Sequence, residues 1–116
     1  MSERTDSEFA RDIEEAIRRI SSYTTGLTYE AFLLDTKTQD AIVRNLEIIG
    51  EAAKGISDRL RAEYPAIPWK SMAGVRDRLI HDYFGVNFDV VWEIITNDLP
   101  KVMEPLKRLL DKEVRE

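Results

Sequence analysis

A long stripe of apolar residues in the middle of the chain constrains the fold more than any other feature. Its members alternate steps of four and three: Ile42, Leu46, Ile49, Ala53, Ile56 and Leu60. This spacing puts them all on one side of an α-helix, whereas a strand would need alternation with a period of two. The stripe predicts one central helix, or two collinear pieces broken near Gly55 with Ser57 capping the second. Ile48 and Ala52 widen it, so we expect neighbours on two sides, one of which a second copy of the chain could supply.

The segments before this stripe also repeat at helical spacing. Phe9, Ile13, Ile17 and Ile20 recur every three or four residues, which predicts a helix over about residues 7–23 with Ser7 as its N-cap. Gly26 and Thr28 then break the pattern, and residues 29–34 are expected to form a short helix.

The second half of the chain predicts three more helical segments. A rigid connector over residues 64–69 holds two prolines and leads into a helix over about residues 68–83, which Gly85 is placed to end. Asn87 is a candidate N-cap for the next helix, and Pro100 opens or kinks a final amphipathic one. No segment alternates with a period of two, so we expect an all-α fold.

Length and composition narrow the classes of protein. The 116 residues, 43% of them hydrophobic, suffice for one domain over residues 1–116. The absence of cysteine excludes disulfides and cysteine-ligated metals, and one histidine with no evident carboxylate cluster argues against a metal site or cofactor. No apolar run approaches the roughly 20 residues that span a bilayer, so we expect a cytoplasmic protein that does not contact membranes. A net charge of −5 argues against a surface that coats DNA or RNA, but it allows a small basic cleft.

The only histidine stands in a short cluster of reactive side chains. Arg76 precedes His81 by five residues, and Tyr83 follows it by two. An imidazole can move protons near neutral pH, and a guanidinium can bind a phosphate through paired hydrogen bonds. The cluster is therefore compatible with cleavage of an RNA phosphodiester, which would need no metal and would leave a 2′,3′-cyclic phosphate.

Residue chemistry alone leaves a structural alternative open and favours it. Arg76 could pair with Asp77 or Asp82, while His81 caps its helix and Tyr83 fills a groove. On an ideal helix of about 100° per residue, Arg76 and Tyr83 share a face, but Arg76 and His81 differ by roughly 140°. Their convergence would require a distorted helix, a long reach by the arginine, or a second subunit across a two-fold axis.

Four separated motifs resemble the HepT-like toxins of the HEPN superfamily. They occupy residues 49–54, 64–69, 74–86 and 91–92, and the resemblance extends over about residues 9–110. It implies an all-α, up-and-down helical bundle of the HEPN type that forms a homodimer. It also implies a metal-independent endoribonuclease, the toxin of a type VII-like toxin–antitoxin module.

The resemblance assigns roles to the residues of the cluster. Arg76 and His81 match the catalytic pair of an Arg-x4-His signature, and Asp77 matches its supporting polar position. Tyr83 matches the tyrosine to which a minimal nucleotidyltransferase antitoxin transfers AMP from ATP. The implied partners are thus an RNA substrate, this antitoxin and a second copy of the chain.

Other residues are weaker candidates. Arg44 and Glu51 share a face of the central helix and could add a cation and an orienting carboxylate, or could simply be solvated. Arg78, with Lys54 and Lys70, is a candidate RNA contact, whereas Trp69 and Trp92 are expected in the core.

Three functions therefore remain open at the level of sequence. The chain could be a toxin ribonuclease, a catalytically silent HEPN dimer that binds or is modified by a nucleotidyltransferase, or a helical dimerisation module. Intact Arg76, His81 and Tyr83 favour the first.

Overall fold

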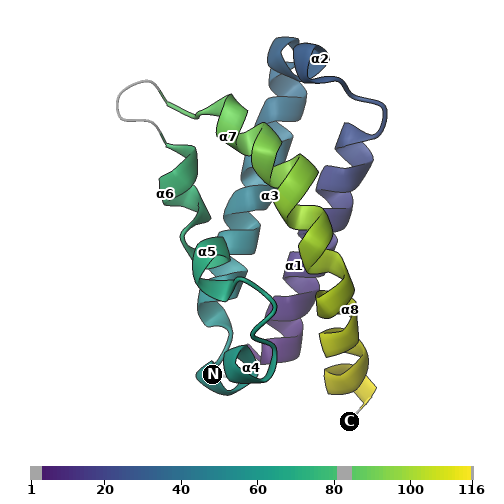
Figure 1. Ribbon diagram of the computed structural model, residues 1–116, viewed down its shortest axis with the longest axis vertical. Helices are drawn as coiled ribbons and strands as arrows, with labels where there is room; N and C mark the ends of the chain where they lie inside the picture. Colours follow the sequence, from purple (N-terminus) through teal and green to yellow (C-terminus); the bar gives the residue numbers. More distant parts are fainter. Residues whose placement is uncertain (1–3, 81–84, 116) are drawn as a thin grey trace.

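The helices run up and down the long axis of the molecule in four arms (Figure 1). This computed structural model describes residues 4–80 and 85–115, with side chains up to residue 112. The first two arms are α1 (Asp6–Thr24) and α3 (Thr36–Gly55), which α2 (Tyr29–Leu34) joins at one end of the molecule, whereas α4 (Asp58–Glu63) lies at the other end. The third arm consists of α5 (Trp69–Ala73) and α6 (Val75–Leu79). The fourth arm contains α7 (Phe88–Glu93), the π-helical turn η2 (Ile94–Asp98) and α8 (Leu99–Arg115). The predicted all-α bundle is confirmed, and so are the bounds of its short second helix.

A capping box fixes the start of α1 and corrects the predicted cap. The hydroxyl of Thr5 accepts a hydrogen bond from the Glu8 backbone N–H, and the Thr5 N–H donates to the Glu8 carboxylate. Both ends of this exchange satisfy donors that the first turn of a helix leaves unpaired. The predicted N-cap, Ser7, was therefore wrong by two residues, because Ser7 already lies inside the helix.

The central stripe forms the buried side of α3 from Ile42 to Ala53, and α3 ends where the sequence predicts a break. Ile56 is extended, with φ −68° and ψ 134°, so the helix ends at Gly55. Ser57 then caps α4 by accepting a hydrogen bond from the Leu60 N–H. The carboxylate of Asp6 also accepts hydrogen bonds from the N–H and hydroxyl of Ser57, at 2.8 and 2.6 Å. These contacts tie the first turn of α1 to the start of α4.

The second neighbour of α3 comes from the same chain. Ile48 lines a hollow with Asn45 on α3 and with Ala16 and Arg19 on α1. Ala52 is buried, and α1 and α3 pack against each other over a long contact. The widened apolar face therefore does not require a second copy of the chain. Whether the protein is a homodimer stays a prediction.

Apolar residues from all four arms meet in one core. Fully or almost fully buried side chains come from α1, α3, α6 and α8, among them Ile13, Ile42, Leu46, Leu79, Leu106 and Leu109. Each such side chain contributes about 1.5–3 kcal/mol when it leaves water. Within the described residues, no helix is long and apolar enough to cross a lipid bilayer.

The helix predicted for residues 68–83 is instead two short helices. Gly74 interrupts it, with φ −94° and ψ 11°, and α6 ends at Leu79 because Ile80 is extended. Gly85 adopts a positive φ of 79°, but it follows the end of α6 by several residues and so does not terminate it. The predicted Asn87 cap is confirmed, since its side chain accepts from the N–H groups of Asp89 and Val90. Pro100 lies in the first turn of α8, as predicted.

Candidate active site

The short helix α6 carries Arg76 on one flank and Arg78 on the other. Val75 and Leu79 are buried and face the core. At about 100° per residue, Arg76 and Arg78 each lie roughly 80° from that buried direction, on opposite sides, whereas Asp77 points away from the core. All three polar side chains are exposed. The two arginines therefore serve different surfaces.

Arg76 makes no hydrogen bond or ion pair with any described residue. In particular it does not pair with Asp77, which was one part of the structural alternative; Asp82, the other predicted partner, lies outside the described residues. An exposed guanidinium with its five donors unoccupied by described groups is available to bind an anion.

The described residues on the two sides of the histidine pair with each other. Ile80 and Val86 form an antiparallel β-bridge, and the Asn87 N–H donates to the Leu79 carbonyl at 2.7 Å. The chain thus leaves α6 and returns to the same place before α7 begins. His81 and Tyr83 lie outside the described residues, in the stretch of sequence between the paired positions.

The predicted helical geometry of the cluster assumed that α6 continues beyond Leu79. In a continuous α-helix the Leu79 carbonyl would accept a hydrogen bond from residue 83, but Asn87 supplies the donor instead. The predicted face shared by Arg76 and Tyr83, and the offset of roughly 140° to His81, both assumed a helix that reaches residue 83. The described helix ends at Leu79, and His81 and Tyr83 lie outside the described residues, so both relations stay predictions.

Arg78 bridges two other elements of the fold. Its Nη1 donates to the Ser71 hydroxyl of α5 and its Nη2 to the Asp98 carboxylate at the end of η2, both at 3.4 Å. The Arg78 and Asp98 side chains are 42% and 43% exposed, so water and other ligands can reach this pair. A role for Arg78 in contacting RNA stays a prediction, but its surroundings differ from those of Arg76.

Gly50 sets how closely α5 and α6 approach α3. A Cβ atom at this position would lie 3.0 Å from the Val75 side chain and 3.3 Å from the Met72 carbonyl oxygen. The segment that joins α5 to α6 therefore packs directly against the backbone of α3. Since Val75 immediately precedes Arg76, this contact positions the arginine.

The weaker candidates on α3 are exposed. Arg44 and Glu51 lie on the side of the helix opposite the apolar stripe, and Glu51 pairs with Lys54 at 3.3 Å rather than with an arginine. Lys70, on α5, is likewise exposed. Their membership of the site stays a prediction.

The two tryptophans have the structural roles expected of them. Trp69 is buried, and its indole N–H donates to the Tyr64 carbonyl across the connector. Trp92 is half-buried, with its ring centroid 5.6 Å from that of Tyr29 and 5.2 Å from that of Phe32. These contacts anchor the start of α5 and the last turn of α7.

Sequence reasoning missed three residues around α6. Ser71 and Asp98 are seven and 20 residues from Arg78, and their pairing depends on how the third and fourth arms meet. Gly50 stands in one of the four motifs, which was the only signal that it matters. Within residues 4–80 and 85–115, no group of three acidic or histidine side chains lies close enough together to hold a metal ion.

Comparisons with known proteins identify the family. The model of the family "Ribonuclease HepT-like" matches residues 13–109. A protein of Methanocaldococcus jannaschii, provisionally named an RNase, is 41% identical over 102 residues, 88% of this chain and 84% of its own length. One of Thermococcus cleftensis, named "Probable ribonuclease HepT", is 43% identical over 106 residues, 91% of this chain and 96% of its own. No solved structure matches the chain at a significant level. The family match spans most of the chain and includes α6 with Arg76, and so the chain belongs to the ribonuclease HepT-like family.

Proposed function

We propose that this protein is a metal-independent endoribonuclease toxin that cleaves RNA with Arg76 and His81 and is silenced by AMP transfer to Tyr83. Family membership supports the ribonuclease activity, because the relatives are named as ribonucleases and the match covers most of their length. The catalytic pair, the antitoxin and the homodimer are our proposals. The cytoplasmic location likewise stays a prediction.

One observation carries the catalytic proposal. Arg76 is exposed and unpaired among the described residues, on a helix that stops three residues later. The bridge between Ile80 and Val86 brings the chain back beside that helix. The sequence places its only histidine directly after Ile80, and thus close along the chain to a guanidinium that has no partner among the described residues.

The proposed reaction is an internal transesterification of RNA. The imidazole of His81 takes the proton of a ribose 2′-hydroxyl, and the resulting imidazolium gives that proton to the departing 5′-oxygen. The 2′-oxygen bonds to phosphorus as the bond from phosphorus to the 5′-oxygen breaks, which leaves a 2′,3′-cyclic phosphate. Arg76 stabilises the negative charge that builds on the phosphoryl oxygens.

AMP transfer to Tyr83 would silence this reaction by charge and by bulk. The phenolic oxygen attacks the α-phosphorus of ATP, loses its proton and releases pyrophosphate. The attached phosphate then adds negative charge two residues from His81, where an RNA phosphate would have to bind. Repulsion and occupied space would act together.

Cleavage of a mixed RNA pool in EDTA tests the catalytic pair. We expect the unmodified protein to leave cyclic phosphate ends, and His81→Ala and Arg76→Ala each to lower the rate of cleavage by roughly 10²–10⁴-fold.

Arg108→Ala is the matched control, because Arg108 is an exposed arginine on α8 that pairs only weakly with Glu104. Circular dichroism should show unchanged helicity in all variants. Full activity in folded His81→Ala would remove the histidine from the mechanism, and no cleavage by unmodified wild type would favour a silent nucleotidyltransferase partner.

Tyr83→Phe tests the proposed switch. We expect this variant to cleave RNA but to resist silencing when a minimal nucleotidyltransferase and ATP are added, because phenylalanine has no oxygen to accept AMP. Tyr23→Phe is the matched control, since Tyr23 is 39% exposed and lies on α1, away from the cluster. Mass spectrometry should find added AMP on wild type and on Tyr23→Phe only. Modification of Tyr83→Phe would place the acceptor elsewhere.

A further inference from the structure

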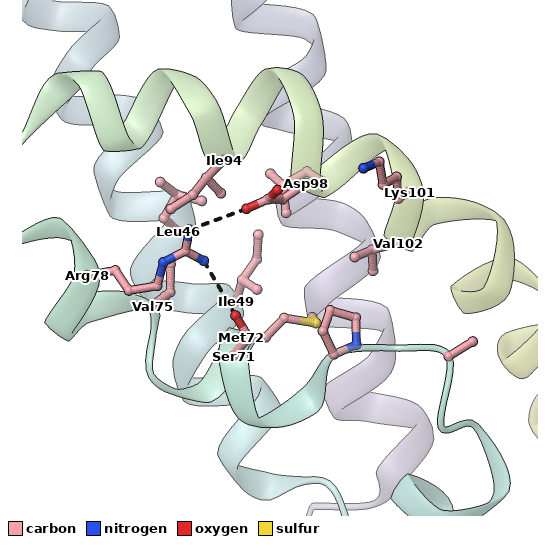
Figure 2. A pocket seen from close by; sticks show the side chains of 13 residues that line it. Leu46, Ile49, Ser71, Met72, Val75, Arg78, Ile94, Asp98, Lys101 and Val102 are labelled. Atoms are coloured by element: carbon pink, nitrogen blue, oxygen red, sulfur yellow. Dashed lines mark hydrogen bonds and ion pairs between the residues drawn. The ribbon is translucent and has the colours of Figure 1, made fainter.

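A pocket of about 490 Å³ opens beside α6, on the flank that carries Arg78 (Figure 2). Its apolar lining comes from three sides: Leu46 and Ile49 on α3, Met72 and Val75 on the third arm, and Ile94 and Val102 on the fourth. Its volume falls within the roughly 300–1,000 Å³ of small-molecule sites. Neither the packing of the bundle nor the proposed chemistry uses this space.

Polar groups of complementary character gather at the pocket. Figure 2 shows the Arg78 guanidinium between Asp98 and Ser71, which approach it from different elements. Lys101, at the start of α8, also lines the pocket and has no hydrogen bond or ion pair among the described residues. Two cations and one carboxylate thus give the lining a net positive charge.

An apolar pocket with a cationic lining suits a nucleotide better than an apolar side chain. The planar base would bury its faces against aliphatic side chains, while other phosphates of the same strand would meet Arg78 and Lys101. An apolar peptide side chain would offer no negative charge to these two cations. The contacts that Arg78 now makes are long, at 3.4 Å, so a phosphate can replace them at small cost.

We propose that this pocket binds a guanine base of single-stranded RNA near the cleavage site. Asp98 makes the choice of base. An ionised carboxylate only accepts hydrogen bonds, and guanine alone among the four RNA bases has two adjacent donors, N1–H and the N2 amino group, on its Watson–Crick edge. Adenine, cytosine and uracil each set an acceptor beside a donor there, and that acceptor would face the carboxylate.

The position of the pocket links it to the proposed reaction, and the inference rests on that proposed function. Arg76 and Arg78 lie on opposite flanks of α6, which with side chains is about 10 Å across. A strand with a rise of roughly 3.4 Å per nucleotide covers this distance in about three nucleotides. A base in the pocket would therefore place a phosphate a few nucleotides away over Arg76. We therefore expect the cleaved RNAs to have a guanine at a fixed number of nucleotides from the cleaved bond.

Binding can be tested without cleavage by 2′-O-methyl RNA trinucleotides, which lack the nucleophilic 2′-hydroxyl. We expect the trinucleotide with a central guanine to shift the methyl NMR signals of Leu46, Ile49 and Val102, and to bind roughly fivefold or more tightly than its uracil counterpart. Asp98→Asn should weaken this preference, because the amide keeps one acceptor oxygen but sets its NH2 donor against the second of guanine's two donors. Equal affinities for guanine and uracil would overturn the proposal.

A plugged pocket gives a second test with a matched control. Ala66 lines the pocket and is exposed, whereas Ala62 is exposed on α4 and does not line it. We expect Ala66→Trp to abolish the methyl shifts and the guanine preference in cleavage, and Ala62→Trp to retain both. If the methyl signals shift with the protein concentration and not with the RNA concentration, the pocket is a contact between two copies of the chain, and the inference is overturned. Cleavage with unchanged preference in Ala66→Trp would reject the pocket alone, whereas guanine binding without any cleavage would reject the proposed function alone.

Discussion

Two arginines separated by one residue show how local geometry divides apparently equivalent side chains. Both belong to a five-residue helix, yet Arg76 has no described partner while Arg78 contacts Ser71 and Asp98. An exposed pair at 3.4 Å contributes at most about 1 kcal/mol. The value of the Arg78 contacts therefore lies in orientation more than in stability, because they join α6 to both α5 and η2.

Asp35 gives a prediction about pH at this same scale. Hydrogen bonds from the Thr38 hydroxyl, at 2.6 Å, and then from the Thr38 N–H, at 3.0 Å, lower the pKa of the Asp35 carboxyl. A pKa lowered by folding stabilises the protein above the unfolded value of about 3.9, and this stabilisation is lost as the pH falls through the folded value. Asp35→Asn keeps an N-cap oxygen without the charge.

We therefore expect Asp35→Asn to be less stable than wild type near neutral pH, with the difference closing as the pH falls below about 4. Urea unfolding at a series of pH values measures this. Asp40→Asn controls for the loss of one negative charge, because Asp40 is exposed on the same helix and has no hydrogen bond to the described residues. A gap that stays constant with pH would show that the carboxylate form has no advantage.

At the scale of elements, the contact between α3 and the α5–α6 segment controls where Arg76 lies. We expect Gly50→Val to lower the free energy of unfolding by about 1–3 kcal/mol, because the added atoms meet Val75 and the Met72 carbonyl. RNA cleavage should fall by more than the loss of folded protein explains, since α6 must move. Urea unfolding and initial rates measure the two effects.

Gly50→Ala is the graded comparison for this substitution. Replacing glycine inside a helix gains up to about 1 kcal/mol in helix propensity, which opposes a clash that needs shifts of only a few tenths of an ångström. We expect its stability to change little. A Gly50→Val protein with wild-type stability and rate would show that α5 and α6 can move away from α3 without consequence.

The elements that the sequence predicts well are those whose ends depend on neighbouring residues. The break at Gly55, the Ser57 cap and the Asn87 cap all rest on bonds within three residues. The end of α6 could not be predicted in this way, because the Asn87 N–H reaches back to Leu79. The spacing of apolar residues does not indicate a hydrogen bond between Asn87 and Leu79.

At the scale of the whole molecule, the same limit applies to the site. The four-motif resemblance identifies the family and points to the cluster around Arg76, because such motifs are linear. The pocket could not be predicted, since its lining comes from three arms, and Asp98 meets Arg78 only after the fourth arm packs against the third. Sequence reasoning therefore reached the reacting residues and missed the surface beside them.

The proposed homodimer gives a prediction for the assembled molecule. If two copies form one cleft, a mixture of inactive Arg76→Ala and inactive His81→Ala proteins should regain part of the activity after unfolding and refolding together. Heterodimers in that mixture contain one intact arginine and one intact histidine. Cleavage rates before and after mixing measure this, with sedimentation to establish that dimers exist. An inactive mixture of exchanged dimers would mean that each protomer needs its own pair.

The π-helical turn η2 has a consequence for the length of this chain. Such a turn holds about one residue more than the α-helical turn it replaces. A chain shortened by one residue here, for example at Thr96, could form an unbroken α-helix from α7 to α8. The two helices would then rotate relative to each other by about 100°, so only one could keep its apolar side on the core. The last arm thus depends on an exact residue count as much as on the identities of its side chains.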